Sequence, residues 1–118
     1  MATVVGDIVH PRYQGIQRWK VKKVAKLAKL IKYRDAVLGE VCYAPKILLL
    51  ESMSIGEVLW FTYWVSTSRT KGEVKWGQRP PILEESVLLE LVKDAIKQDM
   101  FSREFLGELK EEIQAKIG

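Results

Sequence analysis

The chain has 118 residues, of which 47% are hydrophobic and 29% are charged, and its formal net charge is +4. This length fits one domain, and the composition is that of an ordinary globular protein, which excludes a disordered chain, a collagen and a coiled-coil rod. One cysteine and one histidine exclude an internal disulfide, a cysteine-rich metal site and a multi-histidine site.

The sequence predicts neither a membrane-spanning helix nor a secretory signal. No apolar run approaches the roughly 20 residues that a membrane-spanning helix needs. The first ten residues lack the basic and apolar regions of a secretory signal. We therefore expect a soluble, cytoplasmic protein without a membrane partner. Asparagine is absent, and Lys, Glu, Ile, Val and Leu are abundant, which favours a thermophilic source.

Charge is distributed unevenly along the chain. Residues 1–50 hold ten basic and three acidic residues, whereas residues 83–118 hold five basic and nine acidic ones. Such asymmetry suggests that the first half meets a polyanion. The alternative is that basic and acidic faces meet within a dimer, or only keep the protein in solution.

The first 34 residues divide into two segments. Residues 1–16 are either a strand or a partly ordered, flexible arm. Residues 17–34 are predicted to form a helix, because apolar residues recur there at spacings of three and four, and Ala, Leu and Lys are strong helix formers. The apolar stripe consists of Val24, Leu27, Ala28 and Ile31, and the basic stripe of Lys22, Lys26 and Lys29.

Four interpretations of this basic helix stay open. It is a solvated helix face, a contact for nucleic-acid phosphates, a membrane-surface helix or a calmodulin-target-like helix. The membrane interpretation is disfavoured, because the apolar stripe is mostly Ala and Val and is needed to cover a sheet. In the nucleic-acid interpretation, Lys22, Lys26 and Lys29 hold phosphates.

The middle of the chain predicts an antiparallel sheet. Residues 36–43 either continue the helix or begin a strand, and residues 46–53 read as a short buried strand. Residues 57–66, EVLWFTYWVS, are the clearest strand, because aromatic and β-branched residues dominate. A glycine-containing turn leads to a second strand over residues 73–77, which completes a β-hairpin. The pair Pro80–Pro81 then ends the sheet.

The last third of the chain predicts two amphipathic helices, over residues 83–99 and 102–117, with Ser102 as the N-cap of the second. The predicted fold is therefore α+β: an antiparallel sheet of about three or four strands, preceded by a basic helix and followed by two amphipathic helices. All of it forms a single domain, 1–118, with the basic helix and sheet in 17–82. The last helix has a narrow apolar seam, which favours a homodimer.

The hairpin carries the candidate site. Side chains alternate between the faces of a strand, so Trp60 and Trp64 share one face with hydroxyl residues, while Leu59 and Phe61 point into the core. Unpaired bases stack on indoles, and basic side chains hold the phosphates. The predicted nucleic-acid-binding residues are Trp60, Trp64, Arg69, Lys71, Lys75, Arg79, Lys22, Lys26 and Lys29.

The register of the hairpin decides which face Trp76 joins. A turn centred on residues 70–71 pairs Val65 with Trp76, which places Trp76 in the core. It also pairs Ser66 with Lys75, which places Lys75 beside the tryptophans. A shift of one residue would exchange these assignments. The alternative for the whole face is that helices cover both sides of the sheet and every tryptophan is core.

The remaining chemistry-bearing residues indicate no catalytic site. His10 and Cys42 have no partner of matching type nearby, and no phosphate-cradling Gly-rich loop is present. The acidic residues of segment 84–112 have the spacing of a solvated helix face. We therefore expect a protein that is not an enzyme and needs neither metal nor cofactor. A small ribonuclease and a protein–protein interaction or transcription accessory module are the alternatives.

The order of these segments resembles the ThermoDBP group of archaeal single-stranded DNA-binding proteins and their shorter relatives. The resemblance covers residues 17–118 and rests on the basic helix, EVLWFTYWVS, the basic turn with KWGQRPP, and the Leu-rich helices. It implies an antiparallel sheet packed with helices, a basic cleft with aromatic residues that holds a single strand, and dimerisation through C-terminal helices. This chain departs from the group in lacking a long C-terminal zipper. The expected function is binding of single-stranded DNA or RNA with little sequence preference, in association with the nucleoid.

Overall fold

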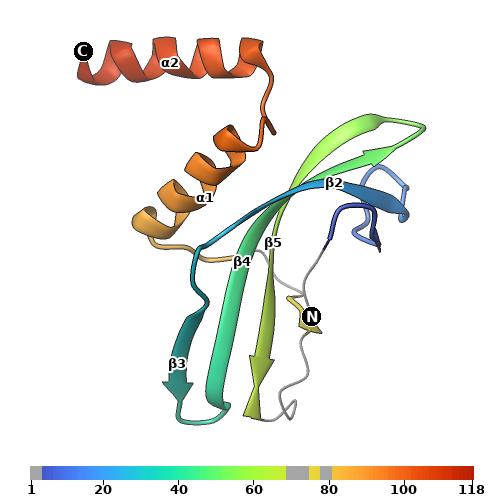
Figure 1. Ribbon diagram of the computed structural model, residues 1–118, viewed down its shortest axis with the longest axis vertical. Helices are drawn as coiled ribbons and strands as arrows, with labels where there is room; N and C mark the ends of the chain where they lie inside the picture. Colours follow the sequence, from blue (N-terminus) through green and yellow to red (C-terminus); the bar gives the residue numbers. More distant parts are fainter. Residues whose placement is uncertain (1–3, 69–74, 78–80) are drawn as a thin grey trace.

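The computed structural model describes residues 4–68, 75–77 and 81–118. Among these residues, a six-stranded antiparallel sheet has the order β1-β2-β4-β5-β6, with β3 also beside β4, and two helices follow it (Figure 1). The elements are β1 (Ile8–Val9), β2 (Trp19–Lys26), β3 (Ile31–Asp35), β4 (Gly39–Ser52), β5 (Gly56–Thr67), β6 (Lys75–Trp76), α1 (Glu85–Lys97) and α2 (Arg103–Ile117). The predicted α+β class and the two C-terminal helices are confirmed, but the sheet has more strands than predicted.

The predicted basic helix over residues 17–34 is wrong, because this segment forms β2 and β3. Its first residues alternate as a strand requires: Trp19 and Val21 are buried, and Lys20 between them is exposed. A bulge after Val21 then shifts the register and returns Val24 to the same side of the sheet. The bulge therefore puts Val21 and Val24, which are three residues apart, on one side of the strand. The same spacing occurs on one face of a helix.

The central strand β4 runs through Pro45. It pairs with β3 over residues 39–43 and with β2 over residues 46–51, and β5 pairs along its other side. Proline lacks the N–H that a ladder uses, and Pro45 stands where the neighbouring strand changes from β3 to β2. On that side neither β3 nor β2 pairs with residue 45, which allows a proline in a central strand. The two predicted segments 36–43 and 46–53 are therefore parts of one long strand.

Helix α1 covers one face of the sheet, where it contacts β2 and β4 (Figure 1). Its Leu91 and Ala95 are fully buried and pack with Ile47 of β4 in one core cluster. The helix does not reach β5, so Leu59 and Phe61, which were predicted as core, stay 38% and 42% exposed. One helix thus covers half of this face.

Helix α1 also fixes the connection between β2 and β3. The Asp94 carboxylate accepts a hydrogen bond from the Lys26 backbone N–H at 3.0 Å, and the Glu90 carboxylate accepts one from the Ala28 N–H at 2.9 Å. These bonds satisfy backbone donors at the point where β2 stops pairing with β4. They hold in place the short segment that presents Lys26 and Lys29.

The opposite face of the sheet has its own core cluster, to which neither helix contributes. Trp19 lies at its centre with no exposed surface, and its indole Nε1 donates to the Ile16 carbonyl at 3.3 Å. The other buried members are Val9, Val21, Leu48 and Leu50, and Trp60 packs against them from β5. We call this side the tryptophan face.

Helix α2 extends away from the sheet (Figure 1). Ser102 caps it as predicted, because its hydroxyl oxygen accepts a hydrogen bond from the Phe105 N–H at 3.1 Å. None of its residues is buried, and Phe105, Leu109 and Ile113 form an exposed apolar stripe. Of the helices that the structure describes, none has the length and apolar character to cross a membrane.

The register of the hairpin differs by one residue from the prediction. Trp76 pairs with Trp64, and Lys75 pairs with Val65. Trp76 therefore joins the tryptophan face, and the predicted placement of Lys75 beside the tryptophans is wrong. The Gly77 N–H donates to the Tyr63 carbonyl at 2.9 Å and extends the pairing by one bond.

Candidate nucleic-acid interface

Three indoles lie together on the tryptophan face. Trp60 and Trp64 come from β5 and Trp76 from β6. The ring centre of Trp76 is 5.3 Å from that of Trp60 and 5.3 Å from that of Trp64. Each such aromatic pair contributes about 0.5–1.5 kcal/mol beyond its buried area, which explains the observed register. The cluster forms a ridge of half-buried rings along β5.

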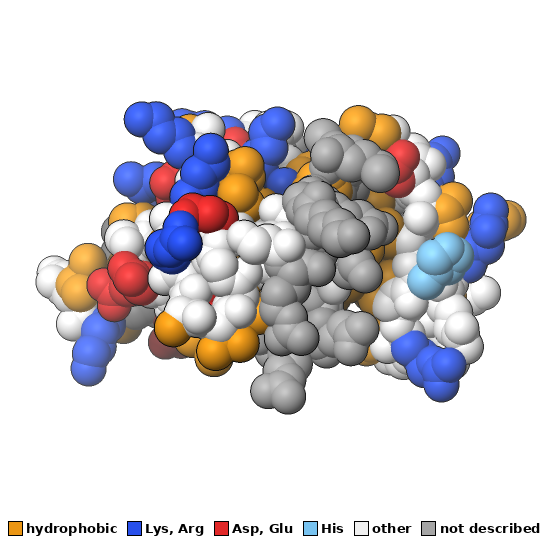
Figure 2. All heavy atoms as spheres, turned by 90° about the horizontal axis from the view of Figure 1, so that it is seen from below, with side chains coloured by type: hydrophobic (Ala, Val, Ile, Leu, Met, Phe, Trp, Pro, Cys, Tyr) orange, Lys and Arg blue, Asp and Glu red, His pale blue; other side chains and the backbone are white. Residues whose placement is uncertain are grey.

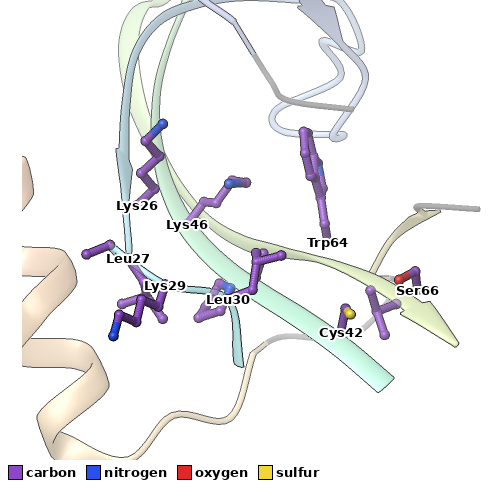
Figure 3. Close-up of a pocket in the computed structure, with 12 residues that line it drawn as sticks. Lys26, Leu27, Lys29, Leu30, Cys42, Lys46, Trp64 and Ser66 are labelled. Carbon is purple, nitrogen blue, oxygen red and sulfur yellow. The ribbon is translucent and has the colours of Figure 1, made fainter. Parts of the chain in front are cut away.

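A hollow of about 390 Å³ opens beside Trp64 (Figure 3). Trp64 lies on its β5 side, whereas Lys26 lines it from β2, Lys29 from the segment that follows β2, and Lys46 from β4. Among the described residues that line it, none is acidic. Its size lies within the roughly 300–1,000 Å³ of ligand pockets in proteins. The hollow therefore combines one aromatic side with three lysines, of which Lys46 reaches toward Trp64 (Figure 3).

Lys46 is the site residue that sequence reasoning missed. Its side chain is only 8% exposed, and its Nζ lies 4.6 Å from the ring centre of Trp64. Burial lowers the pKa of Lys46, and the positive charge of Lys26 lowers it further. In the sequence Lys46 looks like the polar start of a buried strand. Its surroundings depend on residues far away in the sequence, because β4 pairs Lys46 with Lys26 on one side and with Thr62 on the other.

The structure separates the predicted lysines of β2. Lys26 lines the hollow, and Lys29 follows it in the next segment. Lys22 does not join them, because its Nζ forms ion pairs with Glu57 at 2.5 Å and Glu51 at 3.7 Å. The hydrogen bond to Glu57 is the main reason that the pKa of Lys22 is raised. Lys22 thus has carboxylate partners and does not contribute to the basic wall.

The other predicted basic residues are Arg69, Lys71, Lys75 and Arg79. Arg69, Lys71 and Arg79 lie outside the described residues. Lys75 is placed only by its backbone pairing with Val65. Figure 2 shows that lysine and arginine side chains gather at the two sides of the molecule as seen from below, with fewer acidic ones among them.

A second hollow, of about 460 Å³, lies at the other end of the tryptophan face. Trp60 and Trp19 line it together with Arg12 and Tyr13, which come from the segment before β2. Arg12 and Tyr13 are exposed, and sequence reasoning left this segment as a strand or an arm. The two hollows flank the tryptophan ridge, so an extended chain that follows β5 would meet aromatic rings and cations along its path.

The described part of the chain holds no group of three or more His, Cys, Asp or Glu side chains that could bind a metal ion. Comparison with protein-family models, with curated proteins and with solved structures finds no match to this chain. The resemblance to the ThermoDBP group therefore stays a prediction, and the functional argument rests on the geometry of the tryptophan face.

Proposed function

We propose that the protein binds single-stranded nucleic acid, DNA or RNA, with little sequence preference and without catalysing a reaction. One observation carries the proposal: an indole and three lysines line a single hollow on a sheet face that no described helix covers. The resemblance to the ThermoDBP group has lost its basic helix, so only the aromatic strand, KWGQRPP and the C-terminal helices still point in the same direction.

The chemistry of a single strand matches this arrangement. Its unpaired bases offer flat faces that stack on aromatic rings, at about 1–3 kcal/mol per base, and every base has such a face. Its phosphates attract lysines and release counterions when they bind. A duplex hides its base faces, so it would use the lysines and not the indoles. The hollow is lined by both Trp64 and three lysines, Lys26, Lys29 and Lys46. This combination therefore favours a single strand over a duplex as the ligand.

Anisotropy titrations with labelled oligothymidylate and with a duplex of equal length test this proposal. We expect tighter binding of the single strand, quenching of tryptophan emission, and an affinity that falls with salt by a logarithmic slope of about −0.7 per phosphate contact. Two or three phosphate contacts by the lysines of the hollow predict a slope between about −1.4 and −2. Equal binding of both forms without quenching would mean that the lysines act alone, and no binding at low salt would refute the proposal.

A protein-interaction module is the second candidate, and the exposed pair Leu59 and Phe61 favours it. These side chains lie on the α1 side of the sheet, where a partner would bury them. Binding through such apolar side chains depends weakly on salt, whereas binding to phosphates depends on it steeply. The salt series above therefore separates the two functions.

We also infer that two copies pair through α2. Phe105, Leu109 and Ile113 form an exposed stripe at a spacing of four. At 3.6 residues per turn, three glutamates lie along one side of this stripe and a lysine lies on the other. In a parallel helix pair, each acidic edge faces the partner's basic edge. The acidic edge consists of Glu104, Glu108 and Glu112, and the basic edge of Lys110.

Analytical ultracentrifugation at micromolar concentration tests the pairing. We expect the wild-type chain to sediment as a dimer and Leu109→Glu as a monomer, because a carboxylate in the stripe would be buried without a partner. Glu111→Gln changes a charge on the far side of α2 and should leave the dimer intact. A monomeric wild-type chain would contradict the inference.

A further inference from the structure

Lys46 is a buried cation for which no described residue supplies a counter-ion. Its side chain is 8% exposed, and in the part of the chain that the structure describes it makes no hydrogen bond and no ion pair. Lysine is almost never this buried unless it is paired, because removing an ammonium group from water is costly. Such a group lowers the stability of the free protein, so its presence calls for a partner that binds from outside.

The described neighbours of Lys46 do not fully satisfy its ammonium group. The face of Trp64 attracts the ammonium, but a ring satisfies one side of a group that has three N–H donors. The residue opposite Lys46 on β2 is Lys26, a second cation. The nearest strand partner on β5, Thr62, is neutral and buried. The carboxylates of α1 that reach this end of β2 already accept bonds from backbone N–H groups.

We propose that Lys46 and Lys26 together bind one phosphate of the nucleic-acid backbone, and that the adjacent base stacks on Trp64. In the free protein the Lys46 ammonium lies over the indole. In the complex it turns to the phosphate, and the base takes its place over the ring. Two cations on paired strands suit an anion with several oxygens, and the indole beside them suits the base that this phosphate carries. The proposal rests on the proposed function and names the contact that anchors the strand.

This role has an unusual consequence, because the residue that aids binding opposes folding. Lys46→Met keeps the length and apolar stem of the side chain and removes the charge. We expect a higher Tm, because the desolvated charge is gone. We also expect affinity for oligothymidylate to fall about tenfold or more and the salt dependence to become shallower. Lys93→Met removes an exposed charge from α1 and should change neither affinity nor Tm.

A probe with a single phosphate separates this contact from strand binding as a whole. The dinucleotide dTpdT and its neutral methylphosphonate analogue differ only in the charge of one linkage, and NMR titration measures their weak binding. We expect wild-type protein to prefer dTpdT, Lys46→Met to show a weaker preference because only Lys26 remains at the phosphate, and Trp64→Ala to weaken both while keeping the preference. Lys46→Gln serves as a second variant should Lys46→Met not fold.

The outcomes distinguish this contact from the proposed function. If Lys46→Met and Lys46→Gln bind oligothymidylate as the wild type does, with an unchanged salt slope, Lys46 holds no phosphate and the contact is refuted, while strand binding stands. If wild-type protein binds oligothymidylate but does not distinguish dTpdT from its neutral analogue, the contact is likewise refuted. If wild-type protein binds no single strand at low salt, both proposals fail together.

Discussion

Replacing Trp64 with alanine is expected to weaken binding of a single-stranded oligonucleotide by about five- to 150-fold, which corresponds to the loss of one stacked base. Trp64 forms the aromatic side of the larger basic hollow and is half-buried, so its ring has free surface for a ligand. Trp64 is only half-buried and its pairing with Trp76 adds about 0.5–1.5 kcal/mol beyond the buried area, so the variant should still fold. Anisotropy titration measures the affinity, and thermal unfolding checks the fold.

Two further variants decide whether a loss comes from stacking. Trp64→Phe keeps a ring and should retain most of the affinity. Phe61→Ala removes an aromatic ring from the same strand, but Phe61 is exposed on the other side of the sheet and should not affect binding. If Phe61→Ala weakens binding as much as Trp64→Ala does, the effect comes from the strand rather than from a base on the indole.

The parts of the fold that the sequence predicted well depend on short-range signals. The two C-terminal helices follow from apolar residues at helical spacing and from the Ser102 cap, both of which operate within one or two turns. The β5 strand follows from its aromatic and β-branched residues, and alternation along it brought Trp60 and Trp64 to one face. None of these inferences needs knowledge of what packs against the segment.

The failures concern long-range pairing. A bulge in β2 turned the period of a strand into one resembling a helix, and the sequence carries no local mark of a bulge. The same error placed Lys22 in the basic stripe, although its ammonium pairs with Glu57 across the sheet. Lys46 was missed because its setting arises from strands that are separate in the sequence. The one-residue slip at Trp76 has the same origin, since register depends on the contacts of the finished sheet.

The strand assignment of residues 19–26 leads to the largest effect on stability. Trp19→Ala should destabilise the protein by about 3–5 kcal/mol, the usual cost of removing a large buried aromatic side chain, and lower Tm by about 10 °C or more. Trp19 has no exposed surface and lies at the centre of the cluster on the tryptophan face. Loss of its indole N–H also removes the hydrogen bond to the Ile16 carbonyl.

The neighbouring residue provides the matched control, because in a strand the two side chains point to opposite faces. Lys20 is exposed, so Lys20→Ala should change stability by no more than about 0.5 kcal/mol. Residues 19 and 20 of a basic helix would instead lie in its first turn, and neither change would unfold the protein. Thermal unfolding of both variants, followed by circular dichroism, therefore tests the strand directly. A small effect of Trp19→Ala would mean that the core of the tryptophan face, on which the proposed binding ridge rests, is not formed as described.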